Sequence, residues 1–213
     1  MAKSVYSLVL NDDVIELVDR VASANGLSRS NMIEKILADA VSYETPAIRA
    51  NNLFDEIERL VGEGSIMRFL DQPSQYMASI MSALSYRYNP AIKYNVEIFP
   101  HSEDLGQLKV TLRTQNTTLI NLVNDFYRLF ALLEKRYYNP DAKYDYDGIK
   151  YTRVLNYPNE EVTTQQLAEL ITEYVKDFNE LLNTFLSNQD DERLAITLTE
   201  KSFRELFNGK III

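Results

Sequence analysis

The stretch that decides the fold is KSVYSLVLNDDVIELVDRVASANGLSRSNMIEKILADAVS, residues 3–42. Residues 4–10, Ser-Val-Tyr-Ser-Leu-Val-Leu, form a short run rich in apolar and β-branched side chains, which predicts a β-strand, and Asn11 can cap the helix that follows. Residues 13–24 place several apolar side chains on one helical face, and Gly26 ends that helix. Ser28 can then cap a second helix, which carries a broad apolar stripe from residue 32 to residue 40. The stretch therefore predicts one strand followed by two helices.

One strand and two short helices offer too little surface to bury these apolar stripes. A lone strand also leaves both of its edges without hydrogen-bond partners. A second copy of the chain is the simplest remedy, because two strands could pair antiparallel while four helices close over them. The sequence therefore predicts a homodimer.

This pattern resembles the ribbon-helix-helix family of DNA-binding proteins, the Arc, MetJ and CopG type. The resemblance covers residues 3–42, about a fifth of the 213-residue chain. It is carried by the alternating strand, by the Leu-Asn-Asp-Asp entry into the first helix at residues 10–13, and by Asn-Gly-Leu-Ser-Arg-Ser at residues 25–30. An unrelated pair of helices with a leading strand is the alternative interpretation.

The resemblance implies that a two-stranded ribbon enters the major groove of double-stranded DNA. If Tyr6, Leu8 and Leu10 face the helices, the alternate strand residues face outward and read base edges. The start of the second helix would hold a phosphate, because free backbone N–H groups and the helix dipole favour an anion there. The expected DNA-binding residues are Lys3, Val5, Ser7, Val9, Ser28, Arg29 and Ser30.

Two features depart from the family pattern. Members usually carry polar side chains at the outward strand positions, whereas Val5 and Val9 can touch a thymine methyl but cannot form a hydrogen bond to a base edge. Residues 1–45 also hold seven acidic against four basic side chains, although phosphate neutralisation supplies most non-specific affinity for DNA. A module that keeps the fold only for dimerisation is therefore a second interpretation.

The amino-acid composition limits which kinds of structure and site the chain can form. The chain is 46% hydrophobic and 11% aromatic, which is ample for a core, and it contains no cysteine. It can therefore form neither a disulfide nor a thiolate metal site. The sequence shows neither a signal peptide nor a membrane span, so a cytoplasmic protein is expected.

The remainder of the chain predicts a mainly α protein with an α+β C-terminal part. Residues 1–45 form the ribbon-helix-helix module, residues 46–93 a helical connector, and residues 94–213 an α+β domain in which helices cover a small mixed sheet. Within the connector, helices are expected at residues 47–61 and 73–88. In the C-terminal domain, strands are expected at residues 94–99, 108–113, 149–155 and 193–198, and helices at residues 118–137, 163–186 and 199–207.

No pattern in the sequence predicts an enzyme, a cofactor or a metal site. His101, the only histidine, falls in an expected surface loop, and the acids around Gly148 lack the twelfth-position ligand of a calcium-binding loop. Residues 137–157 hold six tyrosines among basic residues, which is typical of strand packing, and of a protein or nucleic-acid interface as alternatives. Residues 159–213 hold eleven acidic and five basic side chains, so this segment could contact a protein partner.

These observations favour a cytoplasmic, homodimeric, sequence-specific DNA-binding protein, a transcriptional repressor of its own operon. A plasmid-partition adaptor that couples DNA to a filament protein is one alternative. The other is a phage or mobile-element inhibitor that uses the N-terminal module only to dimerise.

Overall fold

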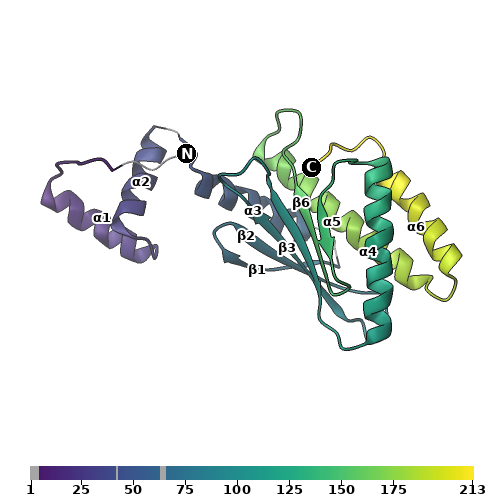
Figure 1. The fold of residues 1–213 in the computed structure, drawn as a ribbon. Coiled ribbons are helices and arrows are strands. Elements are labelled where there is room, and N and C mark those ends of the chain that lie inside the picture. Colours follow the sequence, from purple (N-terminus) through teal and green to yellow (C-terminus); the bar gives the residue numbers. More distant parts are fainter. Residues whose placement is uncertain (1–4, 42, 63–65) are drawn as a thin grey trace. The chain divides into compact units, whose positions relative to one another are not determined.

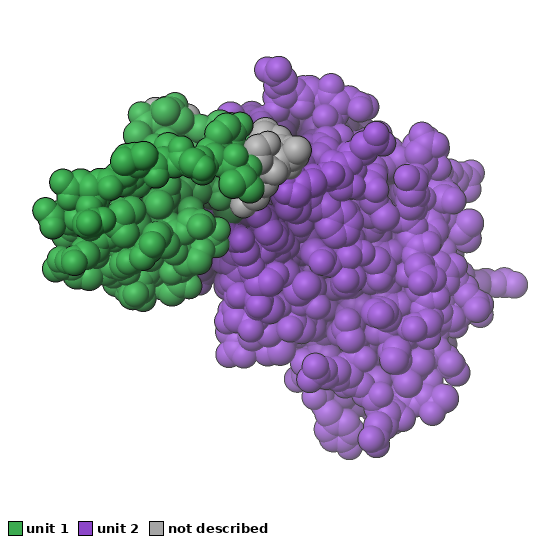
Figure 2. Space-filling model, turned by 60° about the vertical axis from the view of Figure 1, so that its left-hand side comes forward, with its two compact units in different colours: residues 1–49 green, residues 50–213 purple. Residues whose placement is uncertain are grey.

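The computed structural model describes residues 5–41, 43–62 and 66–213 (Figure 1). The chain divides into two compact units, residues 1–49 and residues 50–213, which Figure 2 distinguishes by colour.

The N-terminal unit is built on two helices, α1 (Asp12–Ala24) and α2 (Arg29–Ala40). The side chain of Asn11 caps α1 by accepting a hydrogen bond of 2.9 Å from the backbone N–H of Asp13. Gly26, at φ +64°, makes the turn after α1, and the backbone N–H of Leu27 donates to the carbonyl of Ala22 at 2.9 Å. The helices thus begin and end where their capping residues predicted.

The expected leading strand is absent from the part of the chain that the structure describes. Residues 5–10 lie in no strand or helix, and α1 is the first element. A β-strand needs a neighbouring strand for its backbone hydrogen bonds, and the six-stranded sheet of this chain is made entirely from later residues. The fold-class prediction, with a ribbon-helix-helix start and a small mixed sheet, is therefore wrong for this chain.

The second unit combines four helices with one antiparallel sheet. The strand order is β1-β2-β3-β4-β6-β5, and every neighbouring pair is antiparallel. The helices are α3 (Pro46–Gly62), which begins in the first unit, α4 (Thr117–Tyr137), α5 (Thr164–Ser187) and α6 (Glu192–Leu206). The strands are β1 (Arg68–Ser74), β2 (Met77–Ala83), β3 (Ala91–Ile98), β4 (Gly106–Leu112), β5 (Tyr144–Tyr146) and β6 (Lys150–Leu155).

The helix expected at residues 73–88 was a second error. Strand β2 pairs with β3 over its whole length, from the Met77 and Glu97 pair to the Ala83 and Ala91 pair. The apolar spacing of this segment also fits a helix, and only the pairing with a distant strand decides between the two. Pro73 lies in β1, an edge strand with register shifts, where a residue without an N–H is tolerated.

The strand expected at residues 193–198 was a third error, because helix α6 covers that segment. Its side chains Ala195, Thr199 and Phe203 are buried at four-residue intervals, and Asp191 caps the helix by accepting from the backbone N–H of Leu194. By contrast, α3, α4 and α5 lie close to where the periodicity predicted them, and the Thr163 capping box at the start of α5 is present.

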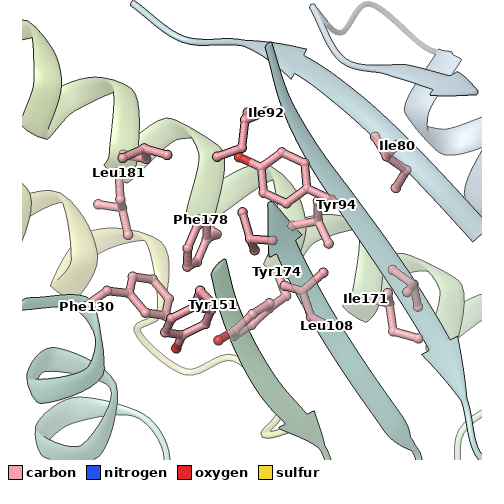
Figure 3. Packing of buried hydrophobic residues seen from close by; sticks show 14 of the residues in the cluster. Ile80, Ile92, Tyr94, Leu108, Phe130, Tyr151, Ile171, Tyr174, Phe178 and Leu181 are labelled. Carbon is pink, nitrogen blue, oxygen red and sulfur yellow. The ribbon is translucent and has the colours of Figure 1, made fainter. Parts of the chain in front are cut away.

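A single core lies between the sheet and the helices (Figure 3). Strand residues such as Tyr94, Leu108 and Tyr151 point into it, and Phe130 of α4 and Phe178 of α5 meet them at the centre. The rings of Phe130 and Phe178 are 4.7 Å apart between centroids. The buried residues of α3 and α6 join the same cluster, so all four helices of this unit pack on one face of the sheet.

The opposite face of the sheet is solvated. Along β3, β4 and β6, fully buried residues alternate with half-buried ones, which is typical of an antiparallel sheet with one wet face. The wet face bears mainly polar side chains, and the hydroxyl of Ser79 donates to the side chain of Asn95 at 2.8 Å. Among the described residues of this unit, no helix packs on that face.

Gly106 has no room for a side chain. A Cβ atom there would come within 2.0 Å of the backbone oxygen of Glu97, in the tightly paired β3–β4 hairpin. We expect Gly106→Ala to destabilise the second unit by about 1–3 kcal/mol, because backbone must move to make space. Gly62→Ala is the matched control, since nothing lies within 4 Å of the added carbon, and it should be neutral or slightly stabilising. Urea unfolding of the two variants, followed by near-ultraviolet circular dichroism, would test this, and equal stability would contradict it.

Candidate nucleic-acid interface

The segment before α1, residues 5–10, presents its side chains to solvent. Val5 and Val9 are 99% and 102% exposed, whereas Leu8 and Leu10 retain 60% and 43%. Ser7, between the two valines, is exposed as well. The three residues expected to read base edges are therefore all accessible. Leu8 and Leu10, which were expected to face the helices, are the least exposed apolar side chains of residues 5–10. Within the described part of the chain, the backbone of residues 5–10 forms no hydrogen bond with other residues.

The two helices after this segment share only a very small core. It consists of Val18, Ala22 and Met32, with Leu27 and Ile33 packed at its side. Larger apolar side chains on both helices remain exposed, namely Val14, Leu17 and Val21 on α1 and Ile36 and Leu37 on α2. A unit of this size usually needs oligomerisation, a metal or disulfides for stability. A partner surface is thus expected on these helices.

The residues expected to hold a phosphate meet at the start of α2. Ser28 caps the helix, its side-chain oxygen accepting from the backbone N–H of Asn31 at 3.3 Å. Arg29 is the first residue of α2, but its guanidinium is engaged in a two-pronged ion pair with Asp19 of α1, at 2.7 and 2.6 Å. This pairing lowers the pKa of Asp19 and raises that of Arg29. Ser30 follows on the exposed surface, and Lys3 lies outside the described residues.

The most unusual polar group in the second unit was not found by sequence reasoning. Glu134 of α4 and Arg153 of β6 are both fully buried, with Arg153 Nε 3.0 Å and Nη2 2.9 Å from Glu134 Oε1. The hydroxyl of Tyr174 donates to the same oxygen at 3.0 Å, and the guanidinium lies 5.0 Å from the centre of the Tyr174 ring. Burial raises the pKa of Glu134, although Arg153 opposes the shift. The only sequence signal was an arginine at an inward position of an alternating strand.

The cluster of Glu134 and Arg153 resembles a structural ion pair more than a reactive site. Neither group reaches solvent, and Tyr151 and Tyr174 close around them, with pKa values that burial raises well above the ordinary range. Neither Glu134 nor Arg153 lines the groove between α4 and α6 or the one beside Lys176 and Asn183 of α5. Its role is to join α4, α5 and β6 within the core.

Most of the tyrosines at residues 137–157 serve packing. Tyr144 and Tyr146 stack on Tyr151, at 6.2 and 6.3 Å between ring centroids. Tyr138 donates to the carbonyl of Ile211 at 2.6 Å and accepts from the backbone N–H of Ile213, so it holds the end of the described chain against the core. This arrangement favours the packing interpretation over a nucleic-acid surface at these rings.

The remaining candidates show no reactive arrangement. His101 lies in the β3–β4 connection, and Asp147 accepts hydrogen bonds from the backbone N–H groups of Ile149 and Lys150, as an ordinary turn residue does. Within the described residues, no group of three His, Asp or Glu side chains could hold a metal ion. No helix in the described part of the chain is long and apolar enough to cross a membrane.

The acidic segment at residues 159–213, expected to contact a protein partner, contains all of α5 and all of α6. A shallow groove of about 390 Å³ lies between α4 and α6, where Leu122, Leu129 and Ile196 form an apolar floor and Asp125 and Glu192 an acidic rim. Residues 211–213 lie in no strand, and Ile213 is buried within its own unit.

Comparison with known proteins gives no relative for this chain: no family model, no curated protein and no solved structure matches it.

Proposed function

We propose that this protein is a homodimeric DNA-binding protein that represses transcription, and that its N-terminal unit carries both dimerisation and DNA contact. The observation that carries the proposal is the exposed apolar surface of α1 and α2, beside a segment of exposed side chains that precedes α1. Helices with so small a core of their own usually need a partner to be stable in water.

A second copy supplies the missing partner for these helices. In the proposed dimer, the exposed face of α1 and α2 is covered by the same helices of the second copy. Val5, Ser7 and Val9, which precede α1, remain exposed and make the proposed contacts with DNA.

Val5→Glu with Val9→Glu tests the contact with DNA. Each glutamate would face phosphates and base edges at the proposed interface, so the variant should lose DNA binding while it remains a dimer. Gel shifts on the DNA upstream of the gene measure the first property, and light scattering with size-exclusion chromatography measures the second. Unchanged DNA binding by a dimeric variant, or a monomeric wild-type chain at micromolar concentration, would overturn the proposal.

Dimerisation without DNA binding is the second candidate function. The ion pair between Arg29 and Asp19 favours it, because a guanidinium already paired offers less charge to a phosphate. The valines at the outer positions and the acidic balance of residues 1–45 point the same way.

Asp19→Asn separates the two candidates. The change removes a negative charge and releases Arg29, so a DNA-binding protein should bind more tightly and show about one additional phosphate contact in its salt dependence. Asp39→Asn on α2 is the matched control, because it changes the net charge equally and Asp39 lies at the other end of that helix from Arg29. Fluorescence anisotropy with labelled duplex DNA is the measurement. Equal affinities for the two variants would mean that Arg29 makes no phosphate contact.

A further inference from the structure

A shallow groove of about 590 Å³ runs along one side of α5, and polar side chains form most of its described lining. Asn179, Asn183 and Ser187 follow one another at four-residue intervals on this side of the helix. The groove is also lined by residues outside that row, namely Ile66, Met67, Ser85, Lys176, Glu180 and Thr184. Its volume falls within the range of about 300–1,000 Å³ that is usual for small-molecule sites. We call it the α5 groove.

Hydrogen bonds within the chain fix the wall of the α5 groove. The side-chain oxygen of Asn183 accepts from the backbone N–H of Ser85 at 2.6 Å, and its amide group donates to the carbonyl of Asn179 at 2.9 Å. The ammonium of Lys176 donates to the carbonyl of Leu60, near the end of α3, at 2.8 Å. These bonds join α3 and the segment after β2 to α5, so a ligand would lose little affinity to ordering of the site.

One polar side chain of the α5 groove is buried and only partly satisfied. Asn179 is 5% exposed, and its side-chain oxygen accepts from the hydroxyl of Tyr94 at 3.0 Å. Burial raises the pKa of Tyr94 well above its ordinary value, so this hydroxyl keeps the proton that it donates. The amide NH₂ of Asn179 has no hydrogen-bond partner among the described residues. Its nitrogen is not sealed from solvent, and the α5 groove is the opening that Asn179 lines. A donor in this position favours a ligand that brings an acceptor.

The groups beside Asn179 suit a ligand rich in hydroxyl groups. A hydroxyl both donates and accepts hydrogen bonds, so it needs donors and acceptors around it. Asn179 supplies a donor, and the carboxylate of Glu180 supplies an acceptor. The hydroxyls of Thr184 and Ser187 supply both. Ile66, which is 76% exposed, offers an apolar surface to the carbon-bound hydrogens of the same ligand.

The charges in the α5 groove favour a neutral ligand. Among the described residues that line it, the charged ones are Lys176 and Glu180, and their charges cancel. We infer that the α5 groove binds a neutral polyhydroxyl ligand, such as a sugar. The Asn179 amide donates to one ligand oxygen, and the Glu180 carboxylate accepts from a ligand hydroxyl. The inference goes beyond the proposed function and does not depend on it, because the residues that line the groove lie in the second unit.

The test is an NMR titration of the isotope-labelled full-length protein. The probes are D-glucose, D-ribose and maltose, with sodium phosphate as a charged comparison, each added to about 50 mM. The side-chain amide signals of Asn179 and Asn183 report binding at the groove itself. Asn179→Asp keeps an oxygen that accepts from Tyr94 and removes the donor. Asn121→Asp is the matched control, since it makes the same change at an exposed position of α4. Glu180→Ala removes the acceptor at an exposed position of α5, without a change in the core.

At least one of the three sugars is expected to shift both amide signals until they saturate, with a dissociation constant of about 1–10 mM. Asn179→Asp and Glu180→Ala should each weaken this binding about tenfold, whereas Asn121→Asp should leave it unchanged. Thermal unfolding checks that each variant is folded, and Glu180→Ala alone decides the outcome if Asn179→Asp is not. The inference is overturned if no sugar shifts these signals, if phosphate shifts them at lower concentration than the sugars do, or if the folded groove variants bind as the wild type does.

Discussion

Replacing Arg153 with methionine should lower the free energy of unfolding of residues 50–213 by about 3–5 kcal/mol. The change leaves the carboxylate of Glu134 fully buried without its cation. The Tyr174 hydroxyl still donates a hydrogen bond to it at 3.0 Å. A charge in that position has lost its solvation by water and gains no compensating ion pair. The loss would be measured by urea unfolding, followed by the near-ultraviolet circular dichroism of the buried tyrosines.

A double variant separates the cost of an unpaired charge from the cost of lost packing. Glu134→Gln with Arg153→Met removes both charges and keeps an oxygen that accepts from Tyr174. We expect it to recover more than half of the stability lost by Arg153→Met, because a buried ion pair can be replaced by neutral groups at little net cost. A double variant as unstable as the single one would show that the arginine acts through its shape and its contact with the Tyr174 ring.

Replacing Phe178 with alanine should cost about 3–5 kcal/mol. This ring lies at the centre of the core, where it contacts Tyr94 and Tyr151 of the sheet and Phe130 of α4 (Figure 3). It also contacts Phe126 of α4, at 5.4 Å between ring centroids. Removing it leaves a cavity that the rigid sheet cannot close. Thermal and urea unfolding would both report the loss.

Two controls accompany this prediction. Phe178→Leu keeps most of the volume and should cost clearly less than the alanine variant. Leu132→Ala removes an exposed side chain from α4 and should lie within about 0.5 kcal/mol of the wild type. Similar losses for Leu132→Ala and Phe178→Ala would contradict the view that this core is organised around the Phe178 ring.

Neighbouring residues in the sequence were sufficient to predict the helices that have clear capping residues. The side chains of Asn11, Ser28 and Thr163 each cap a helix as their sequence context indicated, and Gly26 adopts the positive φ that ends α1. These features depend on residues within four positions of each other, so the sequence contains everything that determines them.

Features that depend on distant residues were not predictable in the same way. The segment at residues 73–88 has an apolar spacing compatible with a helix, and only its pairing with β3 makes it a strand. Likewise, Glu134 and Arg153 look like surface charges in the sequence, and become a pair only because α4 packs across β6.

The two edge strands of the sheet affect how copies of this protein can assemble. One edge strand is β1, which has a shifted register and contains Pro73, and the other is β5, which has only three residues. Irregular or very short outer strands resist the addition of a foreign strand. The larger unit is therefore poorly suited to stacking edge to edge into fibrils, and the proposed dimer, formed through α1 and α2, leaves these two strands uninvolved.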